Sequence, residues 1–110
     1  MRLYIAVLNE VPDFIVPTLV AHTILGADSN FIGFTNYEVW KRESFKKCVV
    51  KVNQKEFDKI AAIEFTYLGH ENKTLDGKKS CAIPLPVYND KLPNVLKFAK
   101  LWKPNENSNY

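Results

Sequence analysis

The chain has 110 residues, of which 46% are hydrophobic and 25% are charged, and its formal net charge is +3. These values are ordinary for one globular domain, and they exclude a disordered or collagen-like chain. No stretch approaches the roughly 20 consecutive apolar residues that span a bilayer, so we expect no membrane segment.

The first predicted element is a strand at Leu3–Leu8, a nearly continuous apolar run typical of a strand covered on both faces. No small-residue cleavage site follows this run, so we expect a cytoplasmic protein without a signal peptide. A helix is predicted over 17–25, because Pro17 suits the first helical position and Gly26 suits the residue that ends a helix. The aromatic-rich segment that follows is too apolar for a free loop, and we expect a short helix around Tyr37–Arg42.

The rest of the chain continues to alternate between strands and helices. Asn53, with Glu56 three residues later, forms a variant of the capping box and marks the start of an amphipathic helix. Pro93 is tolerated in the first turn of a last helix. We expect strands at Lys47–Val52, Glu64–Leu68 and Ser80–Ile83, a polar loop at 69–79, and helices at 54–62 and 92–102.

This alternation predicts the fold class. It favours an α/β fold of three layers, in which a mixed, roughly four-stranded sheet is flanked by helices. No linker or internal repeat divides the chain, so we expect a single domain over residues 1–103. Residues 104–110 are polar except at the last position, and we expect a flexible C-terminal tail there.

The cysteines and histidines give no sign of a metal site. Cys48 and Cys81 are the only cysteines, and both stand within apolar runs, where thiols pack as small hydrophobic groups. We expect no disulfide in a reducing compartment. Together with the distant His22 and His70, the two cysteines lack zinc-site spacing. Glycine-rich nucleotide-binding motifs are also absent, so we expect neither a metal nor a cofactor.

Charge is unevenly distributed along the chain. Residues 1–40 carry one base and four acids, whereas residues 41–110 carry fourteen bases and eight acids. Such an excess can create a positive face that attracts phosphates. The alternative is that these lysines merely solvate exposed helix faces.

Two segments contain side chains that could do chemistry. His22 lies in the first predicted helix, where it is either a hydrogen-bonded structural residue or a catalyst with a carboxylate or hydroxyl within reach. The loop segment 70–74 combines an imidazole, a carboxylate, an amine and a hydroxyl. That mixture could polarise a water molecule or hold a phosphate, although loops are also polar for solubility.

Four aromatic residues could stack on nucleobases if they were exposed. Aromatic side chains that border a small core are usually buried, so we expect core or partner contacts instead. The four residues are Phe31, Phe34, Tyr37 and Trp40.

The order of these features resembles the type 2 peptidyl-tRNA hydrolase family over about residues 3–102. The features that carry the resemblance are the strand Leu3–Leu8, the small residue before His22, Trp40 followed by a basic and apolar strand, the helix after Asn53, the pair Lys73-Thr74, and the apolar strand that ends in Pro84 and Pro86. The resemblance implies the fold described above. It also implies a site in which His22, Lys73 and Thr74 occupy matching positions. Glu71 or His70 would substitute for the family's loop aspartate, and of the two we carry Glu71 into the site.

The lysine that is held to be catalytic in that family has no counterpart, because no lysine lies between Arg2 and Lys41. We therefore expect a divergent member, catalytically weak or silent, that binds RNA or a protein. The alternative is an active hydrolase of the ester bond in peptidyl- or aminoacyl-tRNA. In that case Glu71 or His22 would orient water and Thr74 would stabilise the oxyanion.

In both functions the candidate nucleic-acid contacts are Lys73, Lys78 and Lys79. The expected partner is tRNA or another phosphate-rich ligand. A protein partner, a homodimer and a purely structural role also remain open.

Overall fold

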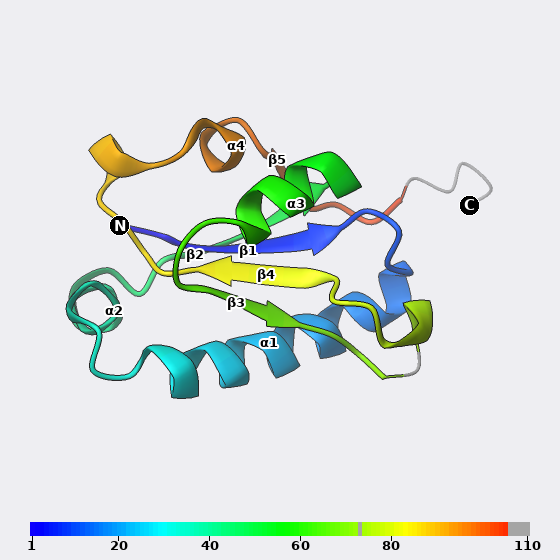
Figure 1. Cartoon of the computed structure of the whole chain (residues 1–110), viewed down its shortest axis with the longest axis horizontal. Coiled ribbons are helices and arrows are strands. Elements are labelled where there is room, and N and C mark those ends of the chain that lie inside the picture. Colours follow the sequence, from blue (N-terminus) through cyan, green and yellow to red (C-terminus); the bar gives the residue numbers. More distant parts are fainter. Residues whose placement is uncertain (73, 106–110) are drawn as a thin grey trace.

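The structure, a computed structural model, describes residues 1–72 and 74–105, and a five-stranded sheet forms its centre (Figure 1). The order along the sheet is β3-β4-β1-β2-β5. The pair β1–β2 is parallel and the other three pairs are antiparallel, so the sheet is mixed. The strands are β1 (Leu3–Leu8), β2 (Lys47–Val52), β3 (Thr66–Gly69), β4 (Cys81–Pro84) and β5 (Lys100–Leu101).

Helices of different lengths connect these strands. Within the described residues the α-helices are α1 (Val16–Phe31), α2 (Thr35–Val39), α3 (Gln54–Ala61) and α4 (Asn94–Lys97). A π-helical turn at Trp40–Ser44 continues α2, so the helix expected around Tyr37–Arg42 is present. Short 3-10 turns lie at Asp13–Ile15, Leu75–Gly77 and Asn89–Lys91.

The helices α1 and α3 cover opposite faces of the sheet, with α1 below and α3 above in the view of Figure 1. Successive side chains of a strand point to opposite faces. In β3, the Thr66 hydroxyl donates to the Ile60 carbonyl of α3 at 3.2 Å, whereas the next side chain, Tyr67, packs on Gly26 of α1. The predicted α/β class is therefore confirmed, with five strands in the sheet rather than four.

The core forms around β1 and α3 as the sequence pattern predicted. Residues 5–8 of β1 are at most 1% exposed, as expected for an apolar strand with helices on both sides. At the start of α3, the Asn53 side chain accepts from the Glu56 amide and the Glu56 carboxylate accepts from the Asn53 amide, both at 2.8 Å. This capping box fixes the first turn of the helix, which then buries Phe57 and Ile60.

The prediction that Gly26 ends the first helix is wrong, because α1 continues to Phe31. Gly26 lies mid-helix, where an added Cβ would stand 2.1 Å from Oη of Tyr67. Gly69 of β3 has the matching role, since a Cβ there would stand 2.2 Å from Oγ1 of Thr23. The glycine in α1 therefore allows close packing of helix and strand, and does not mark a helix end.

The predicted helix at 92–102 is also wrong in its second half. α4 ends at Lys97, and the chain then extends so that β5 pairs with β2. The Trp102 amide donates to the Val49 carbonyl at 2.9 Å. Pairing with β2 satisfies backbone groups that an uncovered edge strand would leave open. This long-range pairing overrides the helical spacing of the apolar residues.

Of the tail expected at 104–110, residues 106–110 lie outside the described part of the chain. The Asn105 amide donates to the Asp13 carboxylate at 2.7 Å, so the segment after β5 reaches the 3-10 turn before α1. None of the helices in the described residues has the length and apolar character needed to cross a membrane.

Candidate functional site

A polar cavity of about 280 Å³ lies where β3 ends, beside α1. Its walls come from α1, from β3 and its following loop, and from the turn that leads into β4. The lining residues are His22, Tyr67, Leu68, Gly69, His70, Glu71, Asn72 and Lys79. Two imidazoles, a carboxylate and an amine thus share one cavity.

His22 is positioned through its neighbour Thr23. The Thr23 hydroxyl donates to the Leu19 carbonyl at 2.7 Å, and the side chain is buried against Gly69. These contacts fix the rotation of α1 on the sheet. The exposed imidazole of His22 is thereby held beside the end of β3.

His70 and Lys79 are brought together by the pairing of β3 with β4. The Ser80 amide donates to the Gly69 carbonyl at 2.9 Å, which places the residues beyond this pair opposite one another. Nζ of Lys79 lies 3.0 Å from Nδ1 of His70. A lysine ammonium can only donate, so Nδ1 accepts and the imidazole carries its proton on Nε2. The pair therefore retains N–H donors on both side chains that a ligand could use.

Of the residues expected to be catalytic, His22 and Glu71 meet in this cavity, and Thr74 is not among its described lining. Oγ1 of Thr74 lies 3.5 Å from Oε2 of Glu71, and the Thr74 amide is 3.4 Å from the Glu71 carbonyl. The hydroxyl is thus directed at the carboxylate. A role for Thr74 in stabilising an oxyanion would require the loop to rearrange.

The lysines expected to contact nucleic acid are placed differently from one another. Lys79 lines the cavity, whereas Lys78 contacts Oε1 of Gln54 and lies 3.9 Å from the Glu10 carboxylate. Lys78 is thus directed toward the start of α3. Lys73 lies outside the described residues.

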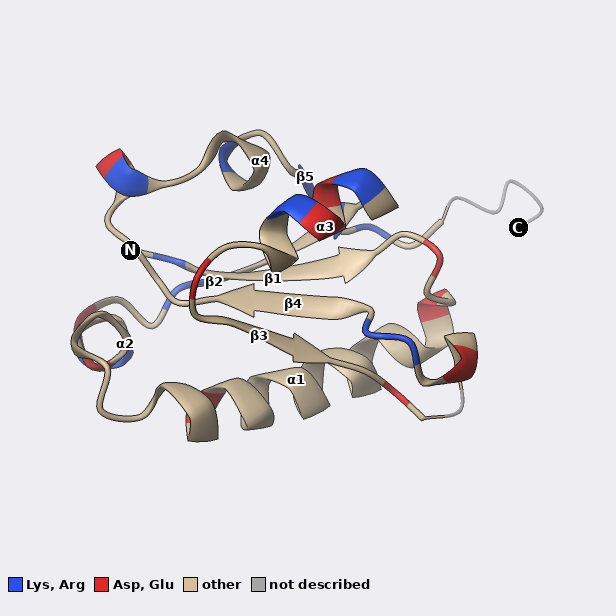
Figure 2. Cartoon of the chain, in the orientation of Figure 1, with Lys and Arg blue, Asp and Glu red and all other residues tan. Residues whose placement is uncertain are grey.

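The basic residues of the second half are spread over several elements. In the view of Figure 2, Lys and Arg lie on α3, near α2 and on the turn before β4. Asp and Glu residues occupy the same end of the molecule as that turn. A phosphate would therefore be attracted by the hydrogen-bond donors of the polar cavity and not by one continuous basic face.

Cys81 lies beneath this region, since it pairs with Gly69 across β3 and β4. Burial raises the pKa of the Cys81 thiol to about 12, and hydrogen bonds with Thr23 and the Ala82 backbone oppose this only in part. The thiol is therefore protonated at neutral pH and cannot act as a nucleophile. Cys48 is half-buried, and both cysteines are free thiols.

The aromatic residues considered for base stacking belong to the core. Phe31, Tyr37 and Trp40 are each at most 3% exposed, and Phe34 is half-buried against the same cluster. Their rings contact one another, with centroids of Phe31 and Tyr37 separated by 5.6 Å. The expectation of core contacts is confirmed for these residues.

Nothing in the sequence marks Tyr67 or Leu68 as cavity residues, because a strand residue in a cavity wall has the same pattern as one in the core. Among the residues that the structure describes, no cluster of three or more His, Cys, Asp or Glu could hold a metal ion. The cavity as built can donate hydrogen bonds to an anion through Lys79 and the imidazoles. It can also hold a water molecule near the Glu71 carboxylate.

A scan against protein-family models finds no family that matches the chain, and a search of curated proteins finds no relative. The residues of the cavity therefore carry the functional inference.

Proposed function

We propose that this protein is a divergent relative of the type 2 peptidyl-tRNA hydrolases that binds RNA, tRNA above all, and has weak or no hydrolytic activity. The observation that carries the proposal is the contact between Lys79 and His70, 3.0 Å apart in a polar cavity that His22 also lines. An ammonium and two imidazoles around one cavity provide N–H donors that suit a phosphate oxygen.

Weak catalysis follows from what the cavity lacks. Ester hydrolysis needs an activated water and donors aimed at the developing oxyanion. The Thr74 hydroxyl is turned toward Glu71. The catalytic lysine that the resemblance would place ahead of α1 is missing, because no lysine lies between Arg2 and Lys41. These observations support a protein that binds its ligand without a complete set of catalytic groups.

An active esterase is the second candidate. His22 of α1 and Glu71 of the loop after β3, which are far apart in the sequence, line the same cavity. A carboxylate and an imidazole that share a cavity are suitable groups for holding and deprotonating water.

Binding of tRNA measured against salt concentration tests the first proposal. We expect affinity to fall steeply with salt, with a log-log slope that decreases by about 0.7 to 0.9 for each phosphate contact removed. Replacing Lys79 and His70 by Gln should weaken binding and lower this slope. Replacing Lys73, Lys78 and Lys79 together by Gln should flatten the slope as well.

Lys59→Gln is the matched control, because Lys59 is an exposed lysine on α3 and does not line the cavity. Two results would contradict an RNA site at this cavity: a tRNA affinity that does not depend on salt concentration, or an affinity that falls equally in Lys59→Gln and Lys79→Gln. A protein partner would then be the better proposal.

A further inference from the structure

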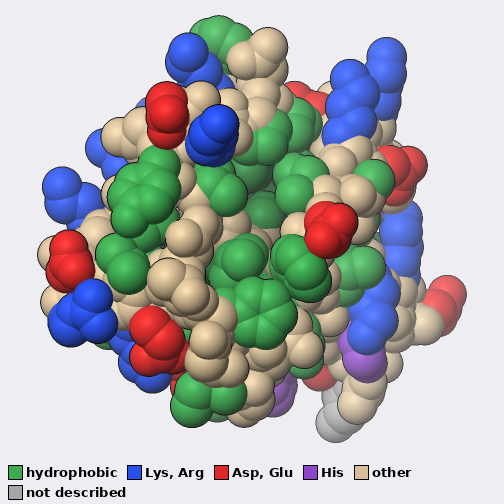
Figure 3. All heavy atoms as spheres, turned by 60° about the vertical axis from the view of Figure 1, so that its left-hand side comes forward, with side chains coloured by type: hydrophobic (Ala, Val, Ile, Leu, Met, Phe, Trp, Pro, Cys, Tyr) green, Lys and Arg blue, Asp and Glu red, His purple; other side chains and the backbone are tan. Residues whose placement is uncertain are grey.

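A second, apolar cavity lies near the opposite end of β1 from the polar one. It has a volume of about 140 Å³ and is enclosed by the start of β1, the residue Ile63 after α3, and the chain from the end of β4 to α4. Figure 3 shows hydrophobic side chains gathered around a hollow on this side of the molecule. Its lining residues are Arg2, Tyr4, Ile63, Pro84, Leu85, Pro86, Val87, Lys91, Leu92, Pro93 and Leu96.

The cavity lies on the face of the sheet that α3 covers incompletely. Pro84 pairs with Thr66, whose side chain meets α3, and Tyr4 points to that face from β1. α4 is only one turn long and ends at Lys97, so it leaves part of this face open. The hollow is thus a consequence of the short final helix.

Its walls are rigid. Pro84, Pro86 and Pro93 line it, and a proline ring fixes the backbone φ angle. The Leu85 amide also donates to the Phe65 carbonyl at 3.1 Å, which ties the wall to the turn before β3. Phe65 itself has a φ of 64°, an unusual left-handed conformation for a bulky residue. Such walls favour a preformed cavity over one that collapses when empty.

The size of the cavity selects small ligands. An apolar cavity of about 150 Å³ stays dry and accepts a molecule of the size of benzene. A cavity of about 140 Å³ therefore suits one ring or a chain of five or six carbons.

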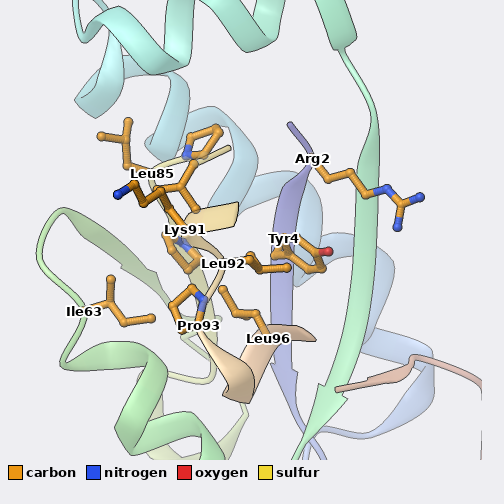
Figure 4. Close-up of a pocket in the computed structure, with 11 residues that line it drawn as sticks. Arg2, Tyr4, Ile63, Leu85, Lys91, Leu92, Pro93 and Leu96 are labelled. Carbon is orange, nitrogen blue, oxygen red and sulfur yellow. The ribbon is translucent and has the colours of Figure 1, made fainter. Parts of the chain in front are cut away.

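The charged residues of the lining are both cationic. Arg2 and Lys91 are exposed, and neither has an ion pair among the described residues. Figure 4 shows the Arg2 guanidinium directed away from the cavity, so only its stem borders the hollow. The neighbouring acids in the sequence, Glu64 and Asp90, are exposed and do not line it. The interior is thus uncharged, and the charged side chains that border the hollow carry positive charge only.

We propose that this cavity binds a small amphipathic anion, a free monocarboxylate whose apolar group of about six carbons fills the hollow. The carboxylate stays in solvent at the mouth, where the positive charges of Lys91 and Arg2 act on it through space and not by direct contact. Burial of the tail supplies affinity, and the two cations distinguish an anion from a neutral or positively charged molecule of the same shape.

Three probes with the same tail and different head groups test the proposal on the unmodified chain: hexanoate, 1-hexanol and hexylammonium. Isothermal titration calorimetry at low salt should rank hexanoate first and hexylammonium last, with hexanoate about three- to tenfold tighter than hexanol. Acetate, which lacks the tail, should not bind.

The double substitution Arg2→Gln and Lys91→Gln changes two exposed side chains and should leave the fold intact. It should bring the affinities for hexanoate, hexanol and hexylammonium close to one another, because the charges that separate the three head groups are gone. Equal affinity for hexanoate and hexylammonium, or no binding of any six-carbon probe to the unmodified chain, would overturn the proposal.

Discussion

The phenol of Tyr67 in β3 lies against the backbone of Gly26 in α1, where an added Cβ would stand 2.1 Å from Oη. Three residues earlier in α1, Thr23 makes the reverse contact with Gly69 of β3. Each element thus contributes one glycine that accommodates a side chain of the other. Because Tyr67 and Gly69 also line the polar cavity, this interlock sets the position of one cavity wall.

Gly26→Ala should therefore destabilise the protein. In an ordinary helix interior this substitution stabilises by about 1 kcal/mol, because alanine is the better helix former. Here the new methyl group meets the ring of Tyr67, and overpacking of this kind typically lowers the free energy of unfolding by about 1 to 3 kcal/mol. Urea denaturation of the two proteins measures the difference.

The same substitution in a Tyr67→Ala background is its control. Without the ring, Gly26→Ala should be neutral or stabilising. A stabilising effect of Gly26→Ala in the unmodified protein would show that α1 and β3 are not in close contact.

Cys81 should make the protein less stable at high pH. Burial raises the pKa of its thiol from an ordinary value of 9.0 to about 12. In the unfolded chain the thiol ionises near pH 9, so its contribution to stability is complete below that pH and is lost as the pH rises toward 12. The loss is about 1.4 kcal/mol per pH unit in this window.

The measurement is the free energy of unfolding between pH 8 and pH 11. Cys81→Ala should flatten the decline, whereas Cys48→Ala retains Cys81 and should keep it. Burial also raises the pKa of Tyr37, and that contribution is common to all three proteins and cancels in the comparison. Identical slopes for the three would contradict a buried thiol.

Asp28 should stabilise the protein at neutral pH and lose this effect in acid. The Tyr37 hydroxyl donates to Oδ1 of Asp28 at 2.6 Å and Nζ of Lys41 lies 2.9 Å from it. The hydrogen bond from Tyr37, followed by that from Lys41, lowers the pKa of Asp28 from its usual 3.8. A lowered pKa gives stability that is present above the unfolded value and disappears as the pH falls through the folded one.

Asp28→Asn should therefore reduce the free energy of unfolding at pH 7, and the difference from the unmodified protein should shrink toward pH 3. The control is Glu43→Gln, which removes the partner of Arg42 in an exposed ion pair and should have almost no effect. A difference that does not change with pH would show that the asparagine acts through packing alone.

The parts of the fold that sequence predicts well are those fixed by neighbours in the chain. The capping box of Asn53 and Glu56 starts α3, and the apolar run of β1 is buried on both faces. Gly26 and the segment around Trp102 were mispredicted because distant residues decide their conformation: Tyr67 for the glycine, and β2 for the last strand. The local spacing of apolar residues cannot predict either of these long-range contacts.

The candidate site shows the same division. The resemblance, together with the residue types of the loop, points to His22 and Glu71, and both line one cavity in the structure. The contact of His70 with Lys79 depends on the pairing of β3 with β4, in which the Ser80 amide donates to the Gly69 carbonyl, and the sequence offers no register from which to infer it. Lys78 and Lys79 are adjacent in the sequence, yet successive side chains diverge at the start of a strand, and only Lys79 reaches the cavity.

The last prediction is that turnover of peptidyl-tRNA is weak or absent. Loss of one positioned oxyanion donor typically lowers the rate by about 10² to 10³. The Thr74 hydroxyl is directed at Glu71, and the lysine expected from the resemblance is missing, so two contributions are lost at once. Residues that act as a unit are not additive, and the combined loss is therefore smaller than the product of the two.

Single-turnover cleavage by the unmodified protein, by Glu71→Ala and by Thr74→Ala measures this directly. Equal, slow release by all three is the expected result, since neither side chain then contributes to the chemical step. Rapid release that collapses in Glu71→Ala alone would assign the carboxylate as the base that activates water. A collapse in Thr74→Ala as well would mean that the loop turns the hydroxyl away from Glu71 when tRNA binds, and the protein would then be an esterase rather than a binding module.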